Sequence, residues 1–300
     1  MIYYHRAIQY NDLTLSIDSI ILDVSITKSE MRDLLNSIIV EISNSNKLST
    51  VTWESHKPGT FRHQTLFQID DNRSFWLGQG LIGNGTLMDR YRLDFNPNKV
   101  GDDPNLRLLL GFLVRNSRNN LCKISRFDLA IDIPIERSKC FLVKDHRLYI
   151  ERRHGIEFTQ YLGSKSSTVG RVKLYNKQAE AKLSNPLTRL ELTLDPSTPF
   201  EQIGFPSVYY IDKNPSITTD RRITNTDRFI VDAILNGYGK LSDLGRKTRA
   251  KIEGIIQEET SRVQITEDAY LAILMQLGDY LAPVSTGNYQ KLKTKETIYE

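Results

Sequence analysis

One nine-residue stretch, Ser125-Arg-Phe-Asp-Leu-Ala-Ile-Asp-Ile133, constrains the fold of this chain more than any other part of the sequence. Its residues fall into two alternating sets, which are Phe127, Leu129, Ile131 and Ile133 on one side and Arg126, Asp128, Ala130 and Asp132 on the other. Successive side chains of a β-strand point to opposite faces. The stretch therefore predicts a strand of a sheet that buries one face and carries charge on the other.

Runs of strand length recur through the first two hundred residues, with helical patterns between them. The expected strands are residues 13–26, 61–69, 74–77, 90–95, 124–133, 149–151, 156–162, 171–175 and 187–194. Apolar residues at spacings of three and four predict helices from the capping-box pattern Thr27-x-x-Glu30 to residue 42, from Asp103-Pro104 to about residue 118, and over residues 176–184. We predict an α+β fold with a mainly antiparallel sheet core and packed helices.

The character of the chain changes after Asp195-Pro196. Turn-forming residues dominate to about residue 225, and helical patterns then cover roughly residues 226–236, 241–259 and 266–281. We expect an α+β domain over residues 1–200 and a mainly helical region over residues 201–300.

Two pairs of segments resemble each other within the first region. Phe75-Trp-Leu-Gly78 is similar to Gln160-Tyr-Leu-Gly163, and Tyr91-Arg-Leu-Asp-Phe95 is similar to Thr188-Arg-Leu-Glu-Leu192. The repetition suggests a core of two related halves. Chance similarity between strands is the alternative.

The basic residues are unevenly distributed. The chain of 300 residues has a formal net charge of +4, yet residues 136–182 contain eleven basic and five acidic side chains. A local basic excess suits a polyanionic partner, nucleic acid first. A solvated, lysine-rich surface is the alternative.

Several classes of protein are excluded. The chain has no run of about eighteen apolar residues and no apolar stretch at its start, so we expect neither a membrane span nor a secretory signal. Its two cysteines, Cys122 and Cys140, are too few for a disulfide scaffold or a Cys/His zinc site. We expect a cytoplasmic protein with no membrane partner.

One motif is rejected. Gly78-Gln-Gly-Leu-Ile-Gly83 matches the dinucleotide fingerprint G-x-G-x-x-G, but that fingerprint requires a helix to begin at the third glycine. The turn-forming Asn84-Gly85 follows instead, which favours a β-hairpin loop. No P-loop sequence is present.

Carboxylates recur on the charged faces of three expected strands and suggest a divalent metal site. Asp128 and Asp132 lie about 13 Å apart on one strand, at about 3.3 Å per residue, so they cannot both ligate one ion. Asp94 and Glu191 occupy similar positions on two other strands. Neighbouring strands can bring such oxygen ligands together on Mg²⁺ or Mn²⁺. The alternative is that each carboxylate pairs with a neighbouring Arg or Lys.

Tyr175 lies within the basic segment. Arg171, Lys173 and Tyr175 would share a strand face, with Lys177 at the turn into a helix. A tyrosine is a weak nucleophile at its ordinary pKa of about 10. Surrounding cations would favour the phenolate and hold a phosphodiester against it. Packing in the core with a solvated hydroxyl is the alternative.

The order of these segments resembles a known family. Residues 125–133, 161–167, 171–180 and 189–194 are similar to the motifs of the trans-acting replication initiators of Gram-positive rolling-circle plasmids. Those motifs are a strand with aspartates, Y-x-G-S-x-x-S, R-x-x-x-Y-[DN]-K-x-x-E and R-x-E-L. The related relaxases of integrative conjugative elements and some filamentous-phage initiators share the pattern. The resemblance covers about residues 90–200.

The resemblance implies a fold like that of nicking endonucleases and a metal-dependent, topoisomerase-like nicking–closing activity. Tyr175 would attack a phosphodiester at the double-strand origin, keep the 5′ end as a phosphotyrosine and release a 3′-OH for the polymerase. A divalent cation, Mg²⁺ or Mn²⁺, would polarise the phosphate oxygens. By their strand faces, Asp94, Asp128, Asp132 and Glu191 are the candidate ligands, with at most one of Asp128 and Asp132 binding directly. Lys177 and Arg171 would neutralise the developing charge.

The resemblance also implies partners. These are double-stranded plasmid origin DNA with a hairpin nick site, single-stranded DNA, a host DNA helicase and a second copy of the chain in a homodimer. Residues 1–200 would be the nickase and residues 201–300 would recognise the origin. The expected DNA contacts are Lys165, Lys173, Arg189, Arg246, Lys247, Arg249 and Lys251.

One feature of the wider class of such endonucleases is missing. None of the five histidines forms a His-hydrophobic-His metal motif, so carboxylates must hold the ion, with His63 as an additional candidate ligand. Two other functions fit the same residues. One is a conjugative-element relaxase with the same chemistry, and the other is a non-catalytic origin-binding protein in which Tyr175 only packs.

Overall fold

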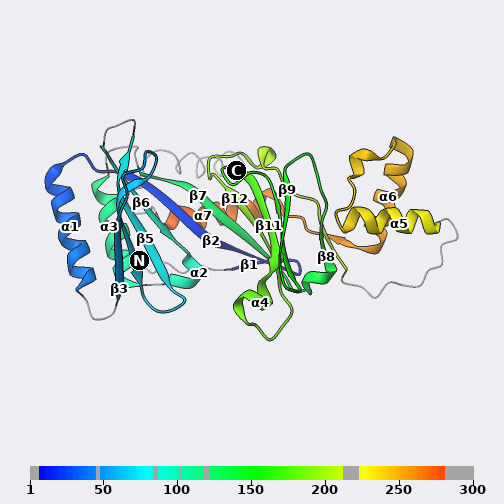
Figure 1. Ribbon diagram of the computed structural model, residues 1–300, viewed down its shortest axis with the longest axis horizontal. Coiled ribbons are helices and arrows are strands. Elements are labelled where there is room, and N and C mark those ends of the chain that lie inside the picture. Colours follow the sequence, from blue (N-terminus) through cyan, green and yellow to red (C-terminus); the bar gives the residue numbers. More distant parts are fainter. Residues whose placement is uncertain are drawn as a thin grey trace, which may run out of the picture.

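The computed structural model describes residues 7–44, 48–83, 87–101, 103–117, 122–211 and 223–280. Figure 1 shows its elements. The fold is α+β, as predicted, and is dominated by an antiparallel sheet of eleven strands in the order β3-β4-β5-β6-β2-β7-β12-β11-β10-β9, with β1 paired to β2. A second sheet has three short strands in the order β14-β13-β8.

The strands of the large sheet are β1 (Ile8–Tyr10), β2 (Leu13–Ser25), β3 (Ser49–Glu54), β4 (Phe61–Gln68), β5 (Ser74–Ile82), β6 (Leu87–Phe95), β7 (Cys122–Ile133), β9 (Tyr149–His154), β10 (Glu157–Leu162), β11 (Val169–Asn176) and β12 (Thr188–Leu194). The small sheet contains β8 (Cys140–Leu142), β13 (Val208–Tyr210) and β14 (Ser261–Arg262). The α-helices are α1 (Ser29–Ser43), α2 (Pro97–Val100), α3 (Pro104–Asn116), α4 (Lys177–Ala181), α5 (Asn225–Leu235), α6 (Arg246–Glu259) and α7 (Glu267–Tyr280). Short 3₁₀ helices cover Arg137–Lys139, Phe200–Gln202 and Leu241–Asp243.

The large sheet consists of two halves with the same strand order. In the first half, β2 is followed by the meander β3 to β6, whose last strand pairs with β2. In the second half, β7 is followed by β9 to β12, whose last strand pairs with β7. The halves join where β2 and β7 pair antiparallel. The equivalent strands are therefore β2 and β7, β3 and β9, β4 and β10, β5 and β11, and β6 and β12.

This equivalence sorts the two similarities found in the sequence. Residues 91–95 and 188–192 lie on β6 and β12, which are equivalent strands. Residues 75–78 and 160–163 lie on β5 and β10, which are not equivalent, because the meander places β5 opposite β11. The similarity between residues 91–95 and 188–192 thus marks the repeat, and the one between residues 75–78 and 160–163 does not.

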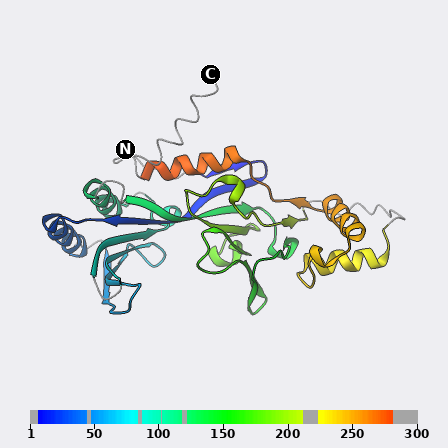
Figure 2. The same ribbon diagram turned by 90° about the horizontal axis from the view of Figure 1, so that it is seen from above.

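One face of the large sheet is covered by helices. Phe127, Leu129 and Ile131 of β7 point into the main core, and Tyr270 of α7 stacks on Phe127 with 6.5 Å between ring centroids. Tyr280 of α7 lies against Phe95 on the same face. Figure 2 shows α3 and α7 on one side of the strands. The opposite face carries Arg126, Asp128 and Asp132, and we call it the polar face.

Two local predictions have clear outcomes. The capping box at Thr27 is wrong, because α1 begins at Ser29 after Lys28, which makes no side-chain cap. The backbone N–H of Ile26 still donates to Asp89 of β6, so the chain stays extended to that point. The start predicted at Asp103 is confirmed, since its carboxylate accepts hydrogen bonds from the N–H groups of Asn105 and Leu106 at 2.9 and 3.0 Å.

The rejected glycine motif lies in a strand. β5 continues through Gly78 to Ile82, with a bulge at Gly80, whose φ is +67°. No helix begins at Gly83 in the part of the chain that the structure describes. The expectation of a hairpin loop is therefore wrong for residues 78–82, which extend the strand predicted at residues 74–77, and the turn-forming residues 84–86 lie outside the described residues.

The residues after 201 divide between two cores. Those of α7 join the main core of the sheet. Helices α5 and α6 form a smaller core of their own with Val143 and Tyr209, at the right-hand end of Figure 1. The boundary at residue 200 stays a prediction, and residues 212–222 and 281–300 of that region lie outside the described residues. None of the helices described has the length and apolar character needed to span a membrane.

Candidate active site around Tyr175

Tyr175 is joined to a carboxylate on the polar face. The register of β11 against β12 places Lys173 opposite Glu191 and Tyr175 opposite Arg189. The Tyr175 hydroxyl donates to Glu191 Oε1 at 2.5 Å, and Lys173 Nζ donates to Glu191 Oε2 at 3.1 Å. Lys173 Nζ also lies 3.8 Å from the centre of the Tyr175 ring. A phenol, a carboxylate and an ammonium thus form one cluster, which we call the Tyr175 cluster.

Burial controls the protonation of this cluster. Tyr175 is only 6% exposed, and burial raises the pKa of its hydroxyl, as does the adjacent Glu191 carboxylate. Burial also raises the pKa of Glu191, which Lys173 and the Tyr175 hydrogen bond oppose. The expectation that surrounding cations favour the phenolate is therefore wrong for the resting site. The phenol is neutral, and Glu191 is the group placed to accept its proton.

Arg189 holds together the three strands beside the cluster. Its guanidinium donates to both carboxylate oxygens of Asp132 on β7, at 2.6 and 2.7 Å, and to Asp18 on β2 at 2.7 Å. The Arg189 side chain is 8% exposed. We expected Arg189 to contact DNA and Asp132 to bind metal, but the Arg189 N–H groups donate instead to the carboxylate oxygens of Asp132. This is the ion pairing that the sequence left open as the alternative.

Asp18 is a residue of the site that the sequence reasoning missed. The pairing of β2 with β7 shifts between Ile17 and Ser19, so Asp18 sits at a β-bulge. A bulge redirects a side chain, and here it aims the carboxylate at Arg189. The available signal is Ser19, which stands where the alternation of Leu13, Leu15 and Ile17 would place an apolar residue and so marks a change of phase just after Asp18.

The four carboxylates predicted to bind metal do not share one site. Glu191 is held by Tyr175 and Lys173, Asp132 is held by Arg189, and Asp128 pairs with Arg126 at 3.3 Å. Asp94 lies on β6, where burial raises its pKa and Asp128 raises it further. Across the described ranges, no three His, Cys, Asp or Glu side chains come together as metal ligands.

The residues present therefore do not fit a preformed carboxylate site for Mg²⁺ or Mn²⁺. His63, the additional candidate, lies on β4 of the first half, with its Nδ1 3.1 Å from Glu54. It belongs to the opposite half of the sheet from Tyr175.

The Tyr-Asn-Lys segment marks the point where β11 ends and α4 begins. The Asn176 side chain caps α4 by accepting from the N–H of Ala179 at 3.0 Å, and it donates to Glu157 at 2.9 Å. Lys177, the first residue of α4, pairs with Glu180 and lies 5.9 Å from the Tyr175 ring centre. The capping asparagine thus fixes the strand end that presents the tyrosine.

Two other predicted residues lie away from the hydroxyl. The Arg171 guanidinium is 5.7 Å from the ring centre of Tyr161, which Arg152 also approaches at 5.8 Å. Lys165 is exposed in the turn between β10 and β11. Arg171 therefore faces a neighbouring aromatic ring instead of the Tyr175 oxygen.

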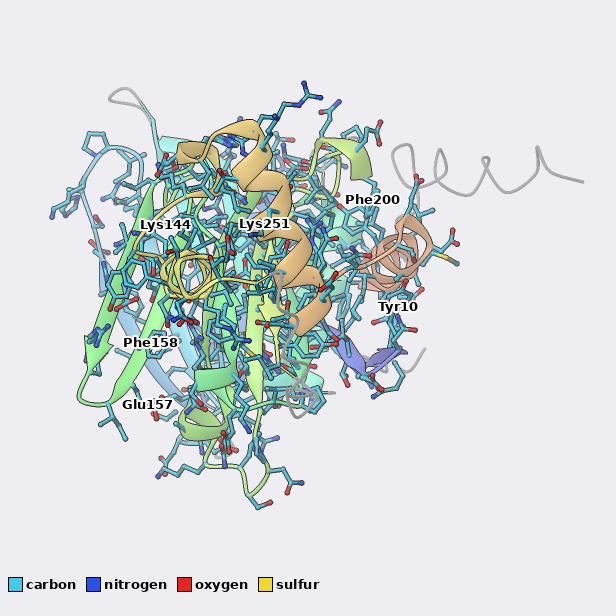
Figure 3. All side chains as sticks on the ribbon, turned by 90° about the vertical axis from the view of Figure 1, so that its right-hand side faces the viewer. Tyr10, Lys144, Glu157, Phe158, Phe200 and Lys251 are labelled. Carbon is cyan, nitrogen blue, oxygen red and sulfur yellow. The ribbon has the colours of Figure 1, made fainter. Side chains whose placement is uncertain are left out.

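The basic residues of α6 divide into two pairs. Arg249 donates to the carbonyl oxygens of Leu241 and Ser242, at 2.8 and 3.1 Å, and so fixes the turn before the helix. Lys251 donates to Asp227 of α5 at 2.6 Å, which lowers the pKa of that carboxyl to about 2. Figure 3, seen from this end, labels Lys251 on α6. Arg246 and Lys247, on the first turn, are exposed and make the better candidates for DNA contact.

Comparison with known proteins adds nothing to this geometry, because neither a family model nor a curated protein matches the chain. The basic segment over residues 136–182 is also partly neutralised inside the chain. Arg137 is buried against Gln160, and Arg147 and Arg153 pair with Asp145 and Glu151. Tyr149 also donates to a carboxylate, Glu151, at 3.0 Å, beneath Lys144. The Tyr175 cluster differs in its shorter hydrogen bond and in the deeper burial of Glu191.

Proposed function

We propose that this protein is a plasmid replication initiator that nicks and recloses one DNA strand through Tyr175. One observation carries the proposal, which is the 2.5 Å hydrogen bond from the Tyr175 hydroxyl to the buried Glu191 carboxylate. A nucleophile hydrogen-bonded to a base is the arrangement that covalent catalysis requires. The order of the motifs around it supports a DNA substrate and the rolling-circle mode of initiation.

The reaction exchanges one phosphate ester for another. The Tyr175 oxygen attacks the phosphorus, its proton passes to Glu191, and the oxygen–phosphorus bond forms as the bond to the 3′-oxygen breaks. The 3′-oxygen leaves as a hydroxyl after taking a proton from solvent, and the 5′ end stays on Tyr175. A raised pKa makes Glu191 a stronger base than an exposed carboxylate. Attack by a 3′-OH on the phosphotyrosine reverses the steps and rejoins the strand.

Lysines accompany the phosphate in this scheme. Lys173 covers the Tyr175 ring, and its side chain is 37% exposed, so it can move off the ring and pair with the incoming phosphate. Lys177 is the next cation along the chain. Both would stabilise the negative charge that builds on the phosphate oxygens. The Arg189 ion pairs keep β7, β12 and the bulge of β2 in place beneath the reacting groups.

A covalent adduct is the direct test. The protein is incubated with supercoiled plasmid that carries the replicon around its gene, with Mg²⁺, with Mn²⁺ and with chelator in parallel. We expect relaxed plasmid and a protein–DNA adduct that survives SDS, both lost in Tyr175→Phe. Tyr238→Phe, at a tyrosine that is 84% exposed, is the matched control and should keep both activities. An adduct formed by Tyr175→Phe would refute the assignment of the nucleophile.

The burial of Tyr175 favours a second candidate function, that of an origin-binding protein without catalysis. A hydroxyl on a side chain that is 6% exposed is also what a structural tyrosine shows. In that case the wild-type chain binds origin DNA and gives no adduct on any replicon sequence near its gene. A conjugative-element relaxase would instead give the adduct on a transfer origin. The helicase partner, the homodimer and the divalent ion stay predictions.

A further inference from the structure

The first half of the sheet contains a counterpart of the Arg189 ion pair and of the strand positions that carry Tyr175 and Glu191. Across the second half, the register aligns Tyr175 with Arg189 and Asp132. Across the first half, the equivalent strands align Gly78 with Arg92 and Asp23. Asp94 follows Arg92 as Glu191 follows Arg189, two residues along the strand.

The ion pairs of the two halves have the same geometry. Arg92 donates through Nε and a terminal nitrogen to the two oxygens of Asp23, at 2.7 and 2.8 Å. Arg189 and Asp132 are joined in the same two-pronged way at 2.6 and 2.7 Å. The counterpart therefore keeps the arginine, its aspartate and the following carboxylate, and it has a glycine in the position of the tyrosine.

Aromatic rings occupy the space above that glycine. A Cβ atom at Gly78 would lie 2.4 Å from Trp76 Cη2 and 2.6 Å from Phe61 Cγ. The two rings meet edge to face with 5.6 Å between centroids, and the Arg92 guanidinium lies 5.6 Å from the Phe61 ring centre. Because Trp76 pairs with Asp94 in the register, the indole belongs to the polar face, which otherwise carries mostly polar and charged groups.

A small pocket opens beside the indole. It has a volume of about 270 Å³, and its lining includes Trp76, Asp94, Asn96, Lys99, Asn72 and Ser74. Pockets for drug-sized ligands begin at about 300 Å³, so this one suits a single nucleobase. The lining offers what a base requires, namely an aromatic ring for stacking, amide and carboxylate groups for its polar edge, and a lysine for the adjoining phosphate.

We propose that the Trp76 pocket binds an unpaired base of the DNA strand on which Tyr175 acts. This inference rests on the proposed function and gives the first half the role of a non-catalytic binding site. In the register, Asp94 pairs with Ile21 of β2, and Ile21 pairs with Arg126 of β7, which shares a strand face with Asp132. Both sites therefore lie on the polar face of one sheet. A single strand can therefore follow that face from one site to the other.

The distance between the sites requires a strand of several nucleotides. Five strand spacings separate β11 from β5, which is about 24 Å, and the sites are offset by about 23 Å along the strands. The direct separation is about 33 Å before the twist of the sheet is counted. Stacked nucleotides at 3.4 Å each would need about ten residues to cover it. A mononucleotide cannot reach both sites.

Tryptophan fluorescence tests the site directly. The chain has two tryptophans, Trp53 and Trp76, so Trp53→Phe leaves Trp76 as the only one. In a Tyr175→Phe background, which prevents cleavage, this variant is titrated with single-stranded oligothymidylate of about 16 nucleotides, the upper site size of one single-strand-binding fold. We expect saturable quenching of Trp76. Thymidine monophosphate at the same phosphate concentration should quench far less.

A dye-labelled strand provides the second measurement. Trp76→Leu should weaken its binding about tenfold, as one lost stacking contact predicts, and Trp76→Tyr should restore most of the affinity. The matched control is Trp53→Phe, which should bind as the parent does. Strand binding without quenching, and unchanged by Trp76→Leu, would overturn the inference while adduct formation could still support the nickase.

The opposite result separates the two proposals in the other direction. Quenching of Trp76 by the strand, together with no adduct from the chain that has Tyr175, would keep the base-binding site and remove the nickase. Equal quenching by thymidine monophosphate and by the strand would assign the pocket to a free nucleotide and overturn the inference as stated.

Discussion

The two halves of the sheet carry the same framework of strands and the same arginine–aspartate pair, yet they differ in burial. Arg189 in the second half is 8% exposed and has Asp18 as an additional partner, whereas Arg92 in the first half is 38% exposed. The second half places a tyrosine above its pair, and the first half places a glycine covered by Trp76. The comparison indicates that the two halves share a framework position and that a few side chains decide what occupies it and how deeply it is buried.

The largest difference between the halves should be found in catalysis. Glu191→Gln keeps the hydrogen bond to Tyr175 and removes the base, so adduct formation should slow by about 10²- to 10⁴-fold. Asp94→Asn, the matching change in the first half, should cause a much smaller loss. Both losses are measured as single-turnover rates of adduct formation on an intact oligonucleotide that contains the nick site. Equal losses would mean that Glu191 is not the base.

Arg189 and Arg92 should differ in how much they contribute to the stability of the fold. Arg189→Ala leaves Asp132 and Asp18 without their partner in a buried place, and we expect it to lower the free energy of unfolding by about 3–5 kcal/mol. Arg92→Ala breaks a more exposed pair and should cost about 1 kcal/mol. Urea denaturation of the two variants gives both values. A cost at Arg92 that matches the one at Arg189 would show that burial does not distinguish the halves.

The glycine that replaces the tyrosine should resist any larger side chain. Gly78→Ala places a Cβ against the rings of Trp76 and Phe61, and the overpacking should cost about 1–3 kcal/mol. Gly111→Ala is the control, because the nearest atom to its Cβ is the end of Arg115 at 3.6 Å and α3 gains helix propensity. In thermal denaturation, the midpoint of Gly78→Ala should be lower than that of the parent, and the midpoint of Gly111→Ala should be higher.

The smallest effect concerns pH. Burial raises the pKa of both Asp94 and Glu191, so at these two carboxyls the folded chain binds more protons than the unfolded chain above about pH 4. Their contribution to stability is therefore full at low pH and falls as the pH rises through the raised values. Asp94→Asn should be more stable than the parent at pH 7 and equal to it at pH 4, because the amide carries no charge to desolvate. Parallel curves of midpoint against pH would contradict this.

Much of the fold follows from periodicity. Strands with one apolar face, such as β7, β11 and β12, are identified by alternation, and the Asp103-Pro104 helix start is identified by its cap. β3 is missed because most of its side chains are exposed on an edge strand and do not alternate. The short strands β8, β13 and β14 are missed because two or three residues carry no period.

The site is harder to predict, because the sequence of one strand does not determine its register against the neighbouring strand. Tyr175 and Glu191 are recognised separately, but their hydrogen bond depends on how β11 aligns with β12. Without that alignment, Glu191 reads as a metal ligand and Arg189 as a DNA contact. The similarity between residues 91–95 and 188–192 assigns Arg92 and Arg189 to equivalent places, but the register of β11 against β12 comes only from the structure.

The pairing of β2 with β7 has one more consequence. These strands are equivalent and run antiparallel, so a two-fold axis perpendicular to the sheet relates the halves. A contact between equivalent strands is the isologous contact of a symmetric dimer, here formed within one chain. The molecule thus has the form of a duplicated and fused ancestor. After fusion the two halves can change independently, so a tyrosine can stand at one of the two equivalent positions, Tyr175, while the other is Gly78.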